Sequence, residues 1–184
     1  MAGRPRSFDR DEALGKLVDV FWTNGYAGAD IDELQGAIGV QRGSFYSAFG
    51  GKGQVFGECL GRYFEEQMTP LFQSIADAGG GRVGLAAFLR KVAAFQASQG
   101  GRGCMFAAAI LNADELDPVA REAADAALKR FNQTLHKAAG GDAALAGFVF
   151  ANACGLHALA SSGASGAKIR GAAEIAATSV ETRA

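Results

Sequence analysis

Hydrophobic residues recur three and four positions apart along most of the chain, and no segment shows the strict alternation of a half-buried strand. The pattern predicts an all-α protein in which Pro70 bends or interrupts the fourth helix. Asp9, Asp30, Asp117 and Asp142 are expected to cap helix starts. The nine helices are expected at about 10–24, 31–38, 42–49, 52–68, 83–99, 104–111, 118–139, 143–160 and 167–180.

The segment 31–49 is predicted to form two short helices joined by a sharp turn at Gly39, where a residue without Cβ is needed. This is the pattern of a helix-turn-helix, whose second helix is short enough to lie in a DNA major groove. The polar residues of that second helix face outward, where they can reach phosphates and base edges. The residues expected to pack inward are Leu34, Ile38, Val40, Phe45 and Phe49, and those expected to face outward are Gln41, Arg42, Ser44, Tyr46 and Ser47.

Composition limits how such a protein can hold DNA. The chain has 184 residues, 49% of them hydrophobic, which is ample for a buried core, and its net charge is −1. The first 55 residues carry six positive and seven negative side chains, so bulk attraction to nucleic acid is excluded. DNA binding must therefore come from where the positive side chains lie. Arg4 and Arg6 lie on an N-terminal arm, and Arg42 and Lys52 lie at the two ends of the second short helix.

The three cysteines, Cys59, Cys104 and Cys154, are an odd number without a paired C-x-x-C spacing. They indicate free thiols, and we expect neither a metal site nor a cofactor. The chain shows no apolar run of the ~20 residues that a membrane helix needs, and its start lacks the apolar segment of a secretory signal. We therefore expect a soluble cytoplasmic protein.

The order of motifs in the first third of the chain resembles the TetR/AcrR family of bacterial transcriptional regulators. An arm with two arginines precedes Phe-Trp-Thr-Asn-Gly-Tyr at 21–26, Ile-Asp-Glu-Leu at 31–34, Gly-Val at 39–40 and Arg-Gly-Ser-Phe-Tyr at 42–46, and then Phe49 and Lys52 follow. Beyond Lys52, the resemblance rests on helix count and on Gly-Cys-Met at 103–105 followed by Asp-Pro at 117–118.

The resemblance implies a nine-helix fold with a helix-turn-helix DNA-binding domain at 1–52 and a ligand-binding and dimerisation domain at 53–184. It implies a regulator, not an enzyme: a homodimer that represses transcription by binding a palindromic, double-stranded operator. A small hydrophobic or aromatic effector would release the operator. Two copies of the motif are needed because one helix reads only a few base pairs.

By position in the motif, Arg42 is expected to meet a guanine edge and Tyr46 a phosphate. Lys52 is expected to meet a phosphate at the start of the fourth helix, and Arg4 or Arg6 to reach a minor groove. Gly43 costs helix stability by ~1 kcal/mol relative to alanine, but it lets the backbone approach DNA closely. Asp30, whose carboxylate repels phosphate, is left out of the set. The DNA-contacting residues are therefore predicted to be Gln41, Arg42, Gly43, Ser44, Tyr46, Ser47, Lys52, Arg4 and Arg6.

An effector pocket is expected in the second part of the chain, because apolar walls with few polar groups suit a hydrophobic or aromatic ligand. The candidates for its wall are Phe88, Phe95, Phe106, Phe131, Phe148 and Phe150, with Asn112, Asn152 and His157 as polar points. The predicted ligand-binding residues are Phe95, Cys104, Phe106, Phe131, Phe148, Asn152 and His157.

Small residues on the last two helices mark a strip that would let another helix approach closely. They favour a dimer seam, although packing inside one chain would use the same pattern. The strip consists of Gly147, Ala151, Gly155 and Ala158 on the eighth helix and Ala173, Ala176, Ala177 and Val180 on the ninth.

Cys104 supports an alternative. It is predicted to lie in the first turn of a helix beside Arg102, and both the helix dipole and a guanidinium stabilise a thiolate. The chain would then be a thiol-based sensor of oxidants or electrophiles, or a small redox enzyme centred on Cys104. The competing interpretation is a small buried residue without chemistry. A third alternative is a ligand-binding adaptor that has lost DNA affinity.

Overall fold

The computed structural model describes residues 9–182, and within them it contains ten α-helices, one π-helical segment, one short 3₁₀ helix and no strand. The predicted all-α class is confirmed. The elements are α1 (Arg10–Gly28), α2 (Ile31–Ile38), α3 (Arg42–Phe49), α4 (Lys52–Tyr63), the π segment (Phe64–Met68), α5 (Thr69–Asp77), α6 (Gly81–Ser98), α7 (Met105–Leu111), the 3₁₀ helix (Ala113–Glu115), α8 (Pro118–Ala138), α9 (Ala143–Ser161) and α10 (Gly166–Thr182).

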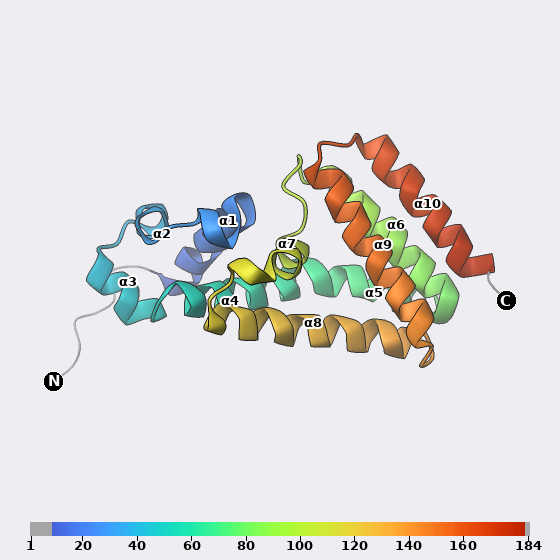
Figure 1. Cartoon of the computed structure of the whole chain (residues 1–184), viewed down its shortest axis with the longest axis horizontal. Helices are drawn as coiled ribbons and strands as arrows, with labels where there is room; N and C mark the ends of the chain where they lie inside the picture. The colour runs from blue at the N-terminus through green and yellow to red at the C-terminus, as the bar shows by residue number, and fades with distance from the viewer. Residues whose placement is uncertain (1–8, 183–184) are drawn as a thin grey trace.

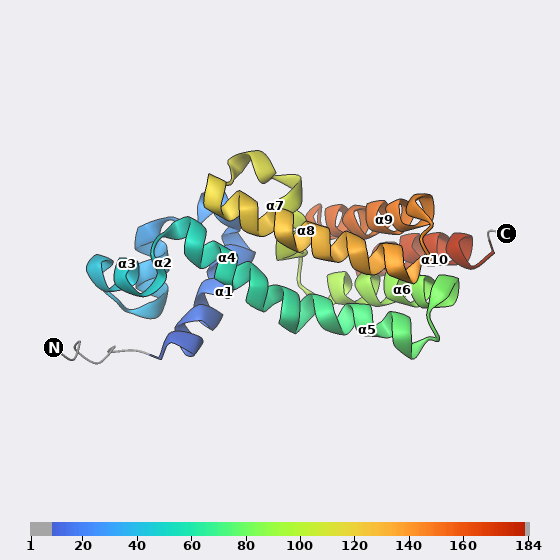
Figure 2. The ribbon, with the colours of Figure 1, turned by 90° about the horizontal axis from the view of Figure 1, so that it is seen from below.

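Helices α4 and α5 form one rod, because the π segment joins them without a break (Figure 2). Counted as rods, the described helices number nine, as predicted. The expected interruption at Pro70 does not occur. The backbone N–H of Thr69 donates to the carbonyl of Phe64, five residues back, and Pro70 falls in the first turn of α5, where a missing N–H is tolerated.

The molecule is elongated, with α1, α2 and α3 at one end (Figure 1). The α4–α5 rod and α8 run lengthwise beside each other, and α6, α9 and α10 pack together at the other end. Helix α7 lies in the middle, where it contacts α1, α4 and α8. Residues 79–81, a candidate linker by composition, form the tight turn that folds α6 back onto α5.

Buried residues of both parts form one continuous cluster, which crosses the boundary predicted at residue 52. The aromatic side of α1 makes this connection. Phe21 and Tyr26 both meet the ring of Phe56 on α4 edge-on, at centroid distances of 5.1 and 4.9 Å. The helix-turn-helix region is therefore anchored to the body through packed rings.

Four aspartates cap helix starts as predicted. The side chain of Asp9 accepts from the N–H of Asp11, that of Asp30 from Glu33, that of Asp117 from Val119 and that of Asp142 from Leu145, at 2.7–2.9 Å. Glycine also ends helices where expected. The helical path of α1 breaks at Gly25, and Gly39 takes the left-handed conformation with φ of 68°.

Helix α9 departs from expectation. It spans 19 residues, and by length and composition alone it is long and apolar enough to cross a membrane, so the statement that no such run exists is wrong. It packs on α6, α8 and α10 as a core helix does. Only 28% of an 18-residue apolar window within it is buried inside the chain, which leaves an apolar side uncovered.

Two glycines of the helix-turn-helix region provide a matched test of the turn. An added Cβ meets nothing within 4 Å at Gly36 or at Gly39, so any effect comes from the backbone. We expect Gly39→Ala to lower the free energy of unfolding by ~1 kcal/mol, because L-residues are strained at this φ. We expect Gly36→Ala, inside a helix, to raise it by up to ~1 kcal/mol. Urea unfolding measures both, and equal effects would contradict the assigned turn.

Candidate nucleic-acid interface and cavity

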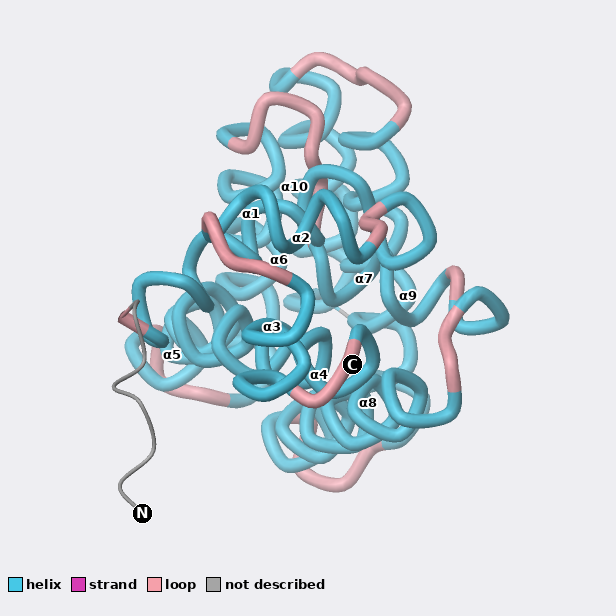
Figure 3. Tube along the Cα trace, turned by 90° about the vertical axis from the view of Figure 1, so that its left-hand side faces the viewer, coloured by secondary structure: helices cyan, strands magenta, loops and turns pink. Residues whose placement is uncertain are grey.

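Helix α3 lies at the tip of the molecule (Figure 3). Its polar side chains are exposed to solvent. Phe45 and Phe49 are 0% and 3% exposed and hold the helix against the core. Leu34 is also fully buried, and Ile38 and Val40 are partly buried against the same core, so the predicted inward set is confirmed. The exposed set, called the reading face below, is Gln41, Arg42, Ser44, Tyr46 and Ser47, and Gly43 is exposed among them.

Arg42 is the main charge on the reading face, and its interactions within the chain are weak. Its Nη1 lies 3.9 Å from Oδ1 of Asp32, both side chains are largely exposed, and its guanidinium stands 5.7 Å from the centre of the Tyr46 ring. Exposed ion pairs of this kind contribute ~0–1 kcal/mol. The guanidinium can therefore leave Asp32 for a stronger acceptor at little cost.

Lys52 lies at the start of α4, below the reading face. Its Nζ stands 4.4 Å from the centre of the Tyr26 ring, and the Tyr26 hydroxyl donates to Oδ2 of Asp117 at 2.5 Å. The hydrogen bonds from Tyr26 and from the N–H groups that Asp117 caps lower the pKa of this carboxyl, with the nearby Lys52 charge contributing. Lys52 thus belongs to a small polar cluster that ties α1, α4 and α8 together.

The predicted arm residues, Arg4 and Arg6, lie outside the described residues. Arg10, the first residue of α1, has a structural position. Its guanidinium pairs with Glu58 at 2.6 Å, donates to the carbonyl of Ala48 and covers the ring of Phe49 at 4.9 Å. It fastens α1 to the end of α3 and to α4.

The loop 99–104 connects the helix-turn-helix region to α9. The indole Nε1 of Trp22 donates to the carbonyl of Gly103 at 3.1 Å, and the N–H of Cys104 donates to Nδ1 of His157 at 2.9 Å. Arg102 covers the Trp22 ring at 4.1 Å and pairs with Asp19. A Cβ at Gly103 would lie 2.5 Å from Nδ1, so only glycine fits between α1 and His157.

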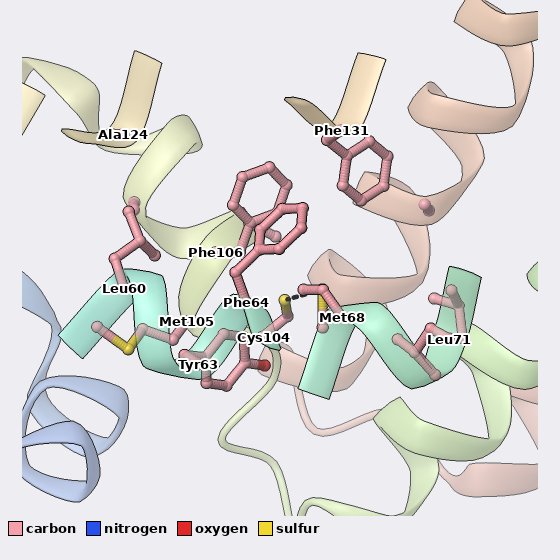
Figure 4. Close-up of a cluster of buried hydrophobic side chains, with 14 of the residues drawn as sticks. Leu60, Tyr63, Phe64, Met68, Leu71, Cys104, Met105, Phe106, Ala124 and Phe131 are labelled. Atoms are coloured by element: carbon pink, nitrogen blue, oxygen red, sulfur yellow. Dashed lines mark hydrogen bonds between the residues drawn. The ribbon is translucent and has the colours of Figure 1, made fainter. Parts of the chain in front are cut away.

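An internal cavity of about 30 Å³ lies between α6, α7, α8, α9 and the α4–α5 rod. Figure 4 shows Phe64, Phe106, Phe131 and Met68 clustered at this part of the core. Phe106 and Phe131 are stacked at 5.1 Å. The lining residues are Met68, Leu71, Phe88, Val92, Phe95, Gln96, Cys104, Phe106, Ala107, Phe131, Phe150, Ala153 and Cys154.

Four of the seven predicted ligand-binding residues line this cavity, namely Phe95, Cys104, Phe106 and Phe131. The other three do not. Phe148 borders a surface hollow with Leu145 and Val180, the Asn152 amide donates to the carbonyl of Phe148, and His157 is occupied by the loop 99–104. On α9, Phe150 lines the cavity, whereas Phe148, two residues earlier, does not.

The environment of Cys104 differs from the one expected for a reactive thiolate, because burial outweighs the N–H groups of Phe106 and Ala107 at the start of α7, which lower the pKa of the thiol. Cys104 is the residue before α7, 4% exposed, and its Sγ contacts Sδ of Met68 at 3.9 Å (Figure 4). Burial raises the pKa of its thiol. Arg102, expected to stabilise the thiolate, is engaged with Trp22 and Asp19 instead. The buried, unreactive interpretation of Cys104 is the one that the geometry supports.

Sequence reasoning missed Gln96, Met68 and Trp22. Gln96 interrupts the apolar side of α6 at a helical position otherwise filled by Val92 and Leu89, and this was a usable signal. Helical spacing places Trp22 on the apolar side of α1 and gives no sign that its indole N–H also donates to the loop 99–104. Nothing in the sequence marks Met68, because a π turn has no sequence signature comparable to a cap.

The short exposed α3, packed across α2 and fastened to a helical body, defines a helix-turn-helix protein of the DNA-binding class. No family model matches the chain. A solved structure of a cysteine-substituted TetR family regulator, CifR, bound to 26-base-pair operator DNA is 30% identical, with a TM-score of 0.83, covering 96% of this chain and 98% of that one. A putative TetR regulator from Rhodococcus sp. RHA1 is 32% identical, with 94% and 99% covered and a TM-score of 0.55.

Curated relatives include the HTH-type transcriptional repressor BdcR of Escherichia coli K12, 29% identical over 123 residues, 66% of this chain. The chain spans 61% of the length of BdcR. The chain belongs to the TetR family of transcriptional regulators, and it is a regulator, not an enzyme. A redox enzyme centred on Cys104 is accordingly not favoured.

His157 makes the link to the loop 99–104 sensitive to pH. Burial lowers the pKa of its imidazole, so the unfolded chain takes up a proton near pH 6.5 while the folded chain resists it. Below that pH the unfolded state binds more protons, and stability falls as pH falls. We expect the free energy of unfolding to fall less between pH 7 and pH 5.5 in His157→Gln than in the native chain. His136→Gln, at the exposed histidine, serves as the control and keeps the native slope.

Proposed function

We propose that this protein is a transcriptional repressor that binds a palindromic double-stranded operator as a homodimer in the cytoplasm and releases it when a small hydrophobic or aromatic effector enters the cavity. The reading face is the observation that carries the proposal: five polar side chains stand exposed on a short helix whose apolar side is fully buried. The operator-bound form of CifR supports it, since the chain matches CifR over nearly its whole length.

In this proposal Arg42 reads a guanine edge, Tyr46 contacts a phosphate, and Gln41, Gly43, Ser44 and Ser47 complete the contact surface. Lys52 holds a phosphate at the start of α4 from its position over Tyr26. Arg4 and Arg6 complete the predicted set from the N-terminal arm.

The uncovered side of α9 supports the dimer. Gly147, Ala151, Gly155 and Ala158 are all exposed and follow one strip of a helix that is otherwise apolar. A large apolar residue of α10, Ile175, is 74% exposed. Small residues let a second helix approach closely, so the partner copy would cover this face.

The part of the seam predicted on α10 needs correction. Ala173, Ala176, Ala177 and Val180 are at most 5% exposed and lie in the core of the same chain, where α10 packs on α6. The residues that α10 offers to a partner are on its opposite side, around Ile175. The intramolecular alternative is therefore correct for the α10 residues, and the proposed seam rests on α9.

The cavity is placed so that a ligand would disturb the helix-turn-helix region. Phe95, in the cavity wall, stacks on Trp22 of α1 at 6.2 Å, and Met68 lies in the π segment of the α4–α5 rod, whose first residues follow α3 in the chain. A cavity of about 30 Å³ must widen to admit a ligand. Movement of Phe95 would be passed to α1, and movement of Met68 to α4, and both helices support the helix-turn-helix region. Ligand binding would then favour a different separation of the two reading faces.

A gel-shift assay with the DNA upstream of the protein's own coding region tests the proposal. We expect a discrete complex at nanomolar protein that is lost in the presence of an excess of the same unlabelled fragment but not of unrelated DNA. The absence of any complex at low salt would contradict DNA binding and leave the adaptor alternative in its place.

Arg42→Ala and Lys52→Ala separate base reading from phosphate binding. We expect Arg42→Ala to lose ~1–3 kcal/mol of discrimination between operator and unrelated DNA. We expect Lys52→Ala to weaken binding to all sequences about equally and to reduce the slope of log affinity against log salt by about one. Lys16→Ala removes an exposed charge outside the proposed surface and serves as the control. The reverse pattern would mean that the two roles are exchanged.

Gly155→Phe tests the seam. Gly155 is exposed, with nothing within 4 Å of an added Cβ, so a large side chain is tolerated in the single chain and blocks a close helix. We expect sedimentation at micromolar concentration to give a dimer for the native chain and a monomer for the variant. Gly61→Phe, at an exposed and equally open site on α4, is expected to remain dimeric. A monomeric native chain would contradict the operator model.

A further inference from the structure

Gln96 is the one polar amide among the side chains that line the cavity in the described structure. It is 3% exposed, and its Oε1 is buried with no hydrogen-bond partner among residues 9–182. Leaving a buried amide oxygen unpaired costs ~1–3 kcal/mol, and buried groups of this kind are nearly always satisfied in folded proteins. Gln96 lies in the wall of the space that a ligand would fill.

The remainder of the wall restricts what can satisfy Gln96. The described lining contains no charged side chain, and its other non-hydrocarbon groups are the Met68 thioether and the thiols of Cys104 and Cys154. An ionised ligand would lose its hydration without compensation. A water molecule needs two to four polar partners, which this wall does not supply.

The shape of the aromatic walls favours a flat ring. Phe106 and Phe131 are stacked in the wall with an interplanar angle of 14°. Phe88, also in the wall, is stacked at 4° on Phe72, which lies behind it and outside the lining. A planar ring can extend such stacks, and the flexible side chain of Met68 can yield to admit it. The cavity volume is only about 30 Å³, so a ligand with a single ring requires the least widening of the cavity.

We propose that Gln96 is the specificity-determining residue of the cavity and that it selects a neutral aromatic ligand carrying a hydroxyl or N–H donor, with phenol as the simplest example. The ligand donor binds to Oε1 of Gln96 while the ring packs among the phenylalanines. This inference rests on the proposed function only for the consequence of binding. The recognition itself is a property of the cavity.

Phenol and toluene form a matched probe pair, because a hydroxyl replaces a methyl of similar size and both are neutral at pH 7. Calorimetric titration of the full chain without DNA measures their affinities. We expect phenol to bind about five- to tenfold more tightly than toluene, the contribution of one hydrogen bond to a buried amide. In Gln96→Leu this preference is expected to disappear, with toluene binding kept or improved. Gln96→Met, an unbranched replacement, repeats the measurement if leucine does not fit.

Gln99→Leu is the control, since Gln99 ends α6 outside the cavity and donates to Ser98. It is expected to keep the native preference for phenol. Equal binding of phenol and toluene to the native chain, an unchanged preference in Gln96→Leu and Gln96→Met, or no binding of either compound at millimolar concentration would overturn the proposal. A Gln96-dependent preference with no effect of phenol on the DNA complex would uphold Gln96 and contradict only the effector role of the cavity.

Discussion

The packing of the aromatic side of α1 against α4 is the interaction on which the other functional features depend. Phe21 meets Phe56 and Trp22 meets Tyr63, both edge-on at about 5 Å between ring centres. Phe21, Phe56 and Tyr63 are almost fully enclosed, and Trp22 is partly buried. Burying one such side chain contributes ~1.5–3 kcal/mol. Because of this packing, the helix-turn-helix region cannot rotate freely on the body, and the direction of the reading face is set by the helices beneath it.

The ring of Trp22 also connects the helix-turn-helix region to the cavity. Trp22 is stacked on Phe95, and Phe95 is part of the cavity wall, so a change in the cavity reaches α1 through one pair of rings. The loop 99–104 provides a second connection through the carbonyl of Gly103 and the N–H of Cys104. Packed interiors respond to an inserted group by shifting whole elements, since they contain few voids that can absorb it.

Much of the DNA-binding end could be predicted from the sequence, because local signals dominate there. The spacing of Phe45 and Phe49 assigned the inward side of α3, and Gly39 and Asp30 fixed where α2 ends and begins. Helix α9 could not be assigned in the same way. It is apolar on nearly all sides, so periodicity does not tell that Phe150 faces the cavity and Phe148 does not. The sequence also could not show whether Arg102 stabilises a thiolate at Cys104. Arg102 packs on the ring of Trp22, a residue far away in the chain, and not on Cys104.

Selection of bound fragments from a pool of random DNA by the full chain measures whether two copies of the reading face recognise DNA at a fixed separation. We expect the enriched fragments to share two inverted half-sites whose centres are about one helical turn, 10–10.5 base pairs, or a multiple of it apart. Enrichment of a single half-site, or of no sequence at all, would contradict this expectation.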